Sequence, residues 1–145
     1  MAYEQLNVGL LMMIAYRSME NRVFAALAES GYGDLTVAQG RIVAQIGAEG
    51  TRLTELAERA QVTKQTAGFL VDQLERAGYV ERVADPSDGR ARLVRLTARG
   101  RAGATYANSV AEQVQTEWAE ELGTASMRQL RRTMTRLRAI TDPYA

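Results

Sequence analysis

The apolar positions at both ends of the chain follow the spacing of long helices. Over residues 5–29 an apolar side chain returns about every three or four positions, interrupted only by Gly9, and this pattern predicts one helix. Residues 97–122 and 125–141 have a similar periodicity and predict two more helices. The last of them has a narrow apolar seam of the kind found in coiled coils. The seam consists of Met127, Leu130, Met134 and Leu137.

Three shorter helices are predicted between these ends. Residues 36–39, TVAQ, have the pattern of a capping box and begin the first, which is expected to end within residues 47–50. Thr54 is expected to cap the second helix and Thr63 the third. The third runs to Gly78, since glycine commonly stops a helix. One apolar stripe predicts its buried face, formed by Ala67, Leu70, Val71 and Leu74.

After Gly78 the pattern becomes that of strands. Residues 79–83 and 92–96 are short β-prone runs, and residues 85–90 between them read DPSDGR. Proline, glycine, aspartate and serine favour turns, so the two runs predict a hairpin over residues 79–96. The 145 residues suit one domain. Its fold class is expected to be mostly α with a small β-hairpin.

Composition excludes several kinds of chemistry. The chain has no cysteine and no histidine, which excludes thiol and histidine catalysis, structural zinc and disulfides. The acidic residues form no paired constellation or metal-ligand spacing, so we expect no enzyme, no metal and no cofactor. The apolar residues 9–16 are too few for a membrane span, and Glu4 precedes them where a signal peptide has positive charge. We therefore expect a soluble cytoplasmic protein.

Residues 53–78 have the layout of a helix-turn-helix. Two predicted helices are joined by residues 61–63, QVT, about the length of the turn in that motif. The outer, N-terminal face of the second helix is polar or small, as in a helix that reads a major groove. This face consists of Gln65, Thr66, Gly68 and Phe69, and the stem of Lys64 is long enough to reach a phosphate. An ordinary amphipathic surface helix is the alternative interpretation.

Positive charge is concentrated at the hairpin. The whole chain has a net charge of +1, but residues 82–101 contain six arginines and two aspartates, a local excess that favours an anionic partner. Arg90 at the tip can enter a minor groove, while Arg92 and Arg95 can neutralise phosphates beside it. Asp88 is expected to fix the loop and to orient a neighbouring arginine. The alternative is a solvated hairpin whose ion pairs contribute about 1 kcal/mol or less.

Several motifs resemble the MarR (multiple antibiotic resistance regulator) family of winged-helix repressors. The resemblance is most specific in the wing, where residues 88–90, DGR, precede residues 94–97, VRLT, and Gly100. Further matching motifs cover residues 34–101: Leu35-Thr36 with Gln39, 56–59 (LAER), 71–75 (VDQLE) and 78–80 (GYV). The resemblance implies a homodimeric transcription regulator that binds double-stranded DNA. It also implies a small, frequently aromatic and anionic effector, held between the dimer helices and the DNA-binding lobe, that often releases the DNA.

The resemblance assigns the DNA-binding residues by position. The start of the recognition helix falls on Thr63, Lys64, Gln65 and Thr66, and the wing pair falls on Asp88 and Arg90. Gln61 departs from the family's pattern because the turn usually has glycine there, so either Gln61 is strained or the turn differs.

Two further departures lie in the recognition helix. Gly68 stands where a hydroxyl residue is common, and because a glycine inside a helix costs about 1 kcal/mol, it suggests a close approach to another group. Phe69 stands where an arginine is common. It either packs under the wing, which we favour, or touches a thymine methyl.

The flanking helices, residues 5–30 and 105–142, are expected to form a dimer. The DNA-binding lobe, residues 34–101, contains the helix-turn-helix (53–78) and the wing (79–96) and buries its own core. The exposed flanks would form larger apolar patches than a soluble monomer usually has. Their stripes are Leu6, Leu10 and Ile14; Val110, Val114, Trp118 and Leu122; and Met127, Leu130, Met134, Leu137 and Ile140. Packing against a second copy gives a two-fold dimer.

In such a dimer the two recognition helices would meet successive major grooves, about 10 base pairs apart, on a near-palindromic DNA site. An intramolecular bundle of the flanks is the alternative. Methionine and aromatic side chains are suited to line an effector cavity, but at helical spacing they are more often core, so no effector residue is assigned. The residues considered are Tyr3, Met12, Met13, Tyr16, Arg17 and Trp118. A different class of function is a helical protein-interaction module whose basic wing binds an acidic partner.

Overall fold

The computed structural model describes residues 5–145 and has the predicted order of elements. Within these residues there are six helices and a two-stranded antiparallel sheet, so the prediction of a mostly α fold with a small hairpin is confirmed. The elements are α1 (Val8–Glu29), α2 (Val37–Val43), α3 (Leu53–Ala60), α4 (Lys64–Arg76), β1 (Val80–Asp85), β2 (Asp88–Leu96), α5 (Ala98–Leu122) and α6 (Thr124–Thr141).

Two of the predicted helix caps have the expected hydrogen bonds. The Thr36 hydroxyl accepts from the Gln39 backbone N–H at 3.1 Å, and the Gln39 side-chain oxygen accepts from the Thr36 N–H at 3.0 Å, which completes a capping box. The Thr63 hydroxyl accepts from the Thr66 N–H at 3.0 Å and begins α4. Gly78 follows α4 in the left-handed conformation, with φ +83°, as a helix stop requires.

The predicted boundaries of α2 and α3 are wrong. Helix α2 ends at Val43 rather than within residues 47–50, because residues 47–51 form a turn in which the Thr51 hydroxyl accepts from the Gly47 N–H at 2.9 Å. Thr54 does not cap α3; it lies inside that helix, whose N-cap is Arg52. Thr51 instead exchanges two backbone hydrogen bonds with Val94 of β2, both 2.9 Å. The turn thus ties the start of α3 to the hairpin.

The core of residues 34–101 is formed by the apolar faces of α2, α3 and α4 and by the base of the hairpin. The predicted stripe of α4 is buried in it as expected. The buried residues of the whole core are Ile42, Val43, Leu56, Ala57, Ala67, Leu70, Val71, Leu74, Tyr79, Val80 and Val94. Because one face of α4 is held by this core, the opposite face is free to meet a ligand.

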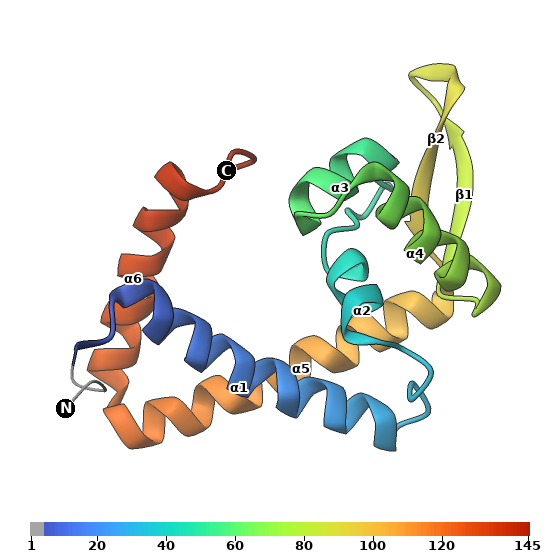
Figure 1. Cartoon of the computed structure of the whole chain (residues 1–145). Coiled ribbons are helices and arrows are strands. Elements are labelled where there is room, and N and C mark those ends of the chain that lie inside the picture. The colour runs from blue at the N-terminus through green and yellow to red at the C-terminus, as the bar shows by residue number, and fades with distance from the viewer. Residues whose placement is uncertain (1–4) are drawn as a thin grey trace.

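The long helices extend away from this lobe. Figure 1 shows α1 crossing α5 at the base of the molecule, with the lobe at one end of α5 and α6 rising from its other end. An ion pair of 2.6 Å between Arg22 and Glu117 joins α1 to α5. Val110 and Val114, expected to face outward until a partner covers them, are already buried within the chain, since α1 packs on that part of α5.

Other apolar residues of the flanks remain exposed in the single chain. Helix α6 has no buried residue among those described, and Ile140 is 83% exposed. Further exposed residues of the stripes are Leu10, Ile14, Leu122, Leu130 and Met134. In the described part of the chain, no helix combines the length and hydropathy required to span a membrane.

Candidate nucleic-acid interface

The exposed N-terminal face of α4 is the first component of the candidate interface. Lys64, Gln65 and Thr66 are all exposed, and the cap residue Thr63 precedes them. The Thr63 hydroxyl also donates to the Thr66 hydroxyl at 3.0 Å, so these two side chains are oriented by each other. The buried stripe on the other side of the helix holds this face outward. Polar donors and acceptors on a fixed helix tip are suited to base edges and phosphates.

The turn before α4 contains a strained residue. Gln61 has φ +58° and ψ +43° and ends α3 in the left-handed conformation, where a residue other than glycine is disfavoured by about 1 kcal/mol or more. Its side-chain amide donates to the Glu58 carbonyl at 2.7 Å, a local bond that partly offsets this strain. The sequence left open whether Gln61 is strained or the turn differs from the family's. The structure has a strained Gln61 in a left-handed turn.

The structure shows no close approach to Gly68 within the described chain, and it contradicts the packing of Phe69 under the wing. A Cβ added to Gly68 would lie 3.7 Å from Leu53, an ordinary contact, so no close approach within the chain requires the glycine. Phe69 is 59% exposed and does not pack under the wing, because it lies on the face of α4 turned away from the core. An exposed aromatic ring therefore follows the polar residues of the helix tip along α4.

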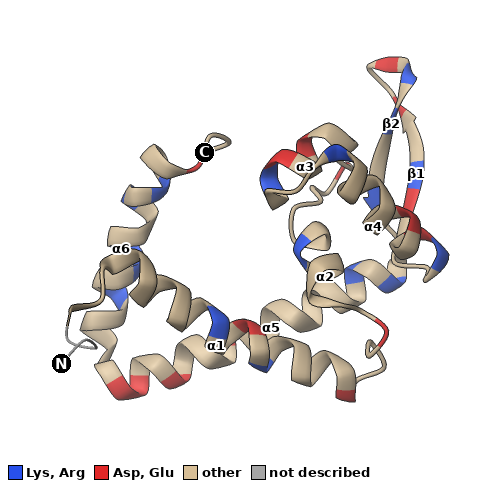
Figure 2. Cartoon of the chain, viewed as in Figure 1, with Lys and Arg blue, Asp and Glu red and all other residues tan. Residues whose placement is uncertain are grey.

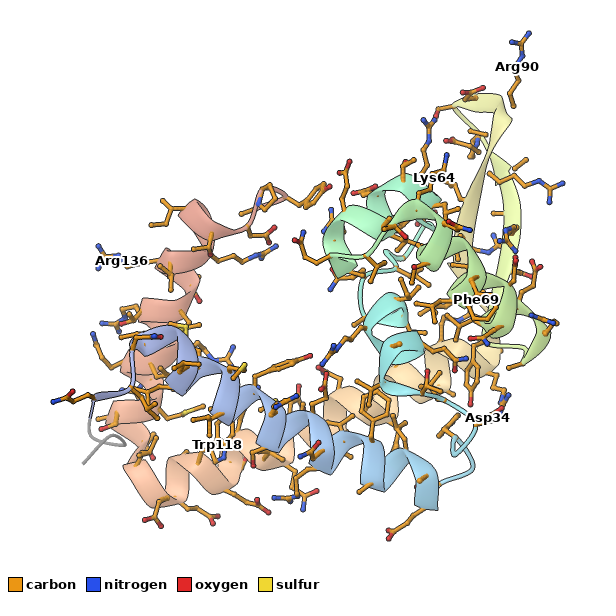
Figure 3. The ribbon with its side chains drawn as sticks, in the orientation of Figure 1. Asp34, Lys64, Phe69, Arg90, Trp118 and Arg136 are labelled. Carbon is orange, nitrogen blue, oxygen red and sulfur yellow. The ribbon has the colours of Figure 1, made fainter. Side chains whose placement is uncertain are left out.

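The hairpin spans the predicted residues, but its strands are longer than predicted and its turn is tight. The register pairs Val80 with Leu96 and Ala84 with Arg92, and then Asp85 with Asp88, so residues 89–91 form a bulge at the tip. Pro86 and Ser87 alone form the turn between the strands. Arg90 lies within the bulge, and its side chain extends from the tip of the wing (Figure 3).

Asp85 at the end of β1 and Arg52, the N-cap residue of α3, hold this turn. The buried Asp85 carboxylate accepts hydrogen bonds from the Ser87 hydroxyl at 2.7 Å and the Ser87 N–H at 2.9 Å. It also accepts from Arg52 at 2.9 and 2.7 Å. The bonds from Ser87, followed by those from Arg52, lower the pKa of Asp85 from 3.8 to about 2. Sequence reasoning missed this anchor because Arg52 is 33 residues away; the only local signal was the Asp–Ser spacing in the turn.

The predicted role of Asp88 is correct for the loop and wrong for the arginine. Its carboxylate accepts from the backbone N–H of Arg90 at 3.0 Å, which fixes the bulge. No bond from Asp88 to an arginine side chain exists among residues 5–145, because the guanidinium of Arg90 points outward. Asp88 therefore shapes the backbone of the tip and leaves the Arg90 charge uncommitted.

The arginines of the wing divide into paired and free ones. Arg95 pairs with Glu81 at 2.6 Å, and Arg82 pairs with Asp72 and Glu75 of α4 at 2.8 and 3.0 Å. Lys64, Arg90 and Arg92 have no carboxylate partner in the described part of the chain. Figure 2 shows charges of both signs along the wing and α4. Lys64 and Arg90 point toward the same end of the molecule, Arg90 from the tip of the wing and Lys64 from the start of α4 (Figure 3).

A cavity of about 420 Å³ lies between α1, α2 and α5, away from the charged tip. Its walls are mainly apolar. Of the residues considered for an effector, Tyr16 lines it, whereas Met12, Met13, Arg17 and Trp118 do not; Tyr3 lies outside the described residues. The polar side chains in the wall include Glu20 and Arg41, which form a 2.9 Å ion pair between α1 and α2.

Comparison with known proteins finds the same architecture and related sequences. A family model described as MarR family matches residues 33–91. The HTH-type transcriptional repressor Rv2887 of Mycobacterium tuberculosis is 36% identical over 88 residues, which are 61% of this chain and 63% of that protein. That alignment spans less than two thirds of the repressor's length.

Two solved structures match almost the whole chain. The M. tuberculosis MarR family protein Rv2887 in complex with salicylic acid is 30% identical, with a TM-score of 0.68, and the match covers 93% of this chain and 98% of that one. CouR from Rhodococcus jostii RHA1, bound to p-coumaroyl-CoA, is 27% identical with a TM-score of 0.71, over 94% of this chain and 93% of that one. The similarity therefore extends beyond the lobe to the long helices.

Proposed function

The chain belongs to the MarR family of transcription regulators, and we propose that it is a homodimeric repressor that binds a near-palindromic site on double-stranded DNA. The observation that supports this best concerns two cations, Lys64 on α4 and Arg90 on the wing. Both charges lack a carboxylate partner in the described chain and point to one end of the molecule (Figure 3). A double helix offers phosphates and two grooves to such a surface.

In the proposed complex the N-terminal end of α4 enters the major groove. Gln65 can pair with a base edge, since an amide matches the donor and acceptor of adenine. Lys64 and the hydroxyls of Thr63 and Thr66 are suited to phosphates. Phe69, exposed on the same helix, offers an apolar contact to a thymine methyl.

The wing supplies the second contact, in the minor groove. Arg90 on the bulged tip is narrow enough to enter it and is attracted by its negative potential. Arg92, also free of a carboxylate partner in residues 5–145, neutralises a phosphate beside it. Arg95 contributes less than expected from the sequence, because Glu81 already neutralises it.

The exposed apolar residues of α1, α5 and α6 form the proposed dimer interface. Leu130, Met134 and Ile140 on α6 have no cover within the described chain, and burying them against a second copy removes apolar surface from water. A two-fold axis then presents two α4 helices to successive major grooves. Two of the similar structures hold salicylic acid and p-coumaroyl-CoA, and we propose that a small effector occupies the α1–α2–α5 cavity.

Selection of bound fragments from random duplex DNA, followed by gel shifts on the selected site, tests this function. Gln65→Ala is expected to relax the base preference more than it weakens overall binding, because Gln65 is assigned to a base edge. A uniform loss across all sequences would restrict Gln65 to phosphate contact. If the protein does not bind duplex DNA at low salt and instead binds an acidic protein surface, the result favours the interaction-module alternative.

A further inference from the structure

The cavity between α1, α2 and α5 has a volume and a lining suited to a small apolar molecule. Its volume of about 420 Å³ falls in the range of small-ligand sites. The aromatic rings of Phe24, Tyr79 and Tyr16 form part of its wall. The Phe24 ring packs directly against Gly40, where a Cβ atom would clash with it. Aromatic walls favour planar ligands that stack or meet them edge to face.

The charges in the wall cancel each other. Glu20 and Arg41 are the charged residues that line the cavity in the described chain. The Glu20 carboxylate, only 8% exposed, accepts from Arg41 Nε at 3.1 Å and Arg41 Nη2 at 2.9 Å. It also accepts from the Tyr16 hydroxyl at 3.0 Å. These bonds, chiefly those from Arg41, lower the pKa of Glu20, so the pair is ionised and neutral overall near neutral pH.

An anionic ligand has no free cation in this cavity. To bind the edge of Arg41 that Glu20 occupies, Nε and Nη2, it must displace Glu20, and the loss of its partner would leave a buried carboxylate uncompensated, which is costly. If the pair stays intact, the ligand's negative charge lies close to that of Glu20, and like charges repel. An uncharged ligand avoids both penalties. It can also donate a hydrogen bond to the Tyr16 oxygen, whose own hydrogen is directed to Glu20.

We propose that the α1–α2–α5 cavity selects an uncharged, planar aromatic ligand with a hydrogen-bond donor, and that the Glu20–Arg41 pair excludes carboxylates. The proposal rests on the proposed function only in treating this cavity as the place where an effector binds. Binding of the ligand itself needs no DNA and is measured on the protein alone.

Salicylamide and salicylate test the proposal because they share a ring and a hydroxyl and differ in charge. Isothermal titration calorimetry of the purified protein near neutral pH is expected to give a Kd for salicylamide at least about tenfold lower than that for salicylate. Glu20→Gln is expected to improve salicylate binding by about tenfold or more, since the charge of Arg41 is then free. Salicylamide binding should change little. Glu29→Gln, an exposed substitution in the same helix, is the matched control and should alter neither value.

Several outcomes overturn the proposal. These are salicylate binding as tightly as salicylamide to the unaltered protein, failure of both to bind, or no gain of salicylate binding in a folded Glu20→Gln variant. If Glu20→Gln does not fold, Arg41→Gln replaces it: salicylate should then bind still more weakly, and an unchanged salicylate Kd refutes the role of the pair. Loss of duplex binding in gel shifts, with salicylamide still bound preferentially, would refute the proposed function and leave the ligand class standing.

Discussion

Substitution of Arg90 provides a quantitative test of the proposed DNA interface. Three cations per chain at this surface, Lys64, Arg90 and Arg92, lack a carboxylate partner in the described residues, which makes six in a dimer. Because each neutralised phosphate contributes about −0.9 to the log–log slope of affinity against salt, the dimer should have a slope of about −5.4. That slope corresponds to a loss of about 2,000-fold in affinity between about 50 and 200 mM salt.

Arg90→Ala removes two of the six charges and should reduce the slope to about −3.6, or a loss of about 150-fold over the same range. The assay is fluorescence anisotropy on the selected duplex at four or more salt concentrations, with thermal unfolding as a check on the fold. The matched control is the double variant Glu81→Gln/Arg95→Gln, which removes the 2.6 Å pair without changing the net charge. It should retain the slope of about −5.4.

The reasoning fails in either of two ways. If Arg90→Ala keeps the full slope, Arg90 releases no counterions and does not lie in the groove. If the double variant loses as much slope as Arg90→Ala, the ion pair of Arg95 does not keep that arginine from the DNA. In that case the distinction between paired and free arginines does not describe the interface.

Two further predictions concern the parts that position the wing. The pKa of Asp85 is lowered from 3.8 to about 2 in the folded protein, so its stabilisation is present above about pH 4 and is lost as the pH falls toward 2. Asp85→Asn should therefore lower the Tm at pH 7, and its difference from the unaltered protein should narrow in acid; an equal difference at both ends would refute the role of the carboxylate. A Cβ on Gly100 would lie 2.1 Å from the Tyr79 carbonyl oxygen, so Gly100→Ala should destabilise the protein by about 1–3 kcal/mol in denaturant unfolding. Gly89→Ala, with nothing within 4 Å, is the control, and equal losses from both would contradict the packing argument.

The features predicted well from the sequence are those set by neighbouring residues. The capping box of Thr36 and Gln39 and the cap of Thr63 depend on contacts three residues apart, and such patterns are local. The buried face of α4 follows from helical spacing alone. Thr54 was a plausible cap by composition, but the turn that joins Thr51 to Val94 starts α3 earlier. The pairing of Thr51 with Val94 therefore determined which of two possible residues caps α3.

Contacts between distant residues were beyond the reach of these patterns. Glu20 and Arg41 are 21 residues apart, and nothing in either segment distinguishes them from the other acidic and basic residues of the chain. The cavity they share with Tyr16 depends on how α1 crosses α5 (Figure 1), which periodicity does not specify. The sequence therefore indicated residue types suited to an effector site and did not identify which of them line it.

The availability of each wing arginine depends on the register of the hairpin. Arg95 lies opposite Glu81 and is neutralised by it, whereas Arg92 lies opposite Ala84, which has no charge to offer. A shift of the register by one residue would place a strand's side chains on the other face and would set Arg95 opposite Val80. Beside Arg95, this register is held by Thr51, which exchanges two backbone hydrogen bonds with Val94. The free charge of the wing thus depends on a contact with a segment outside it, and no pattern within the wing can reveal that contact.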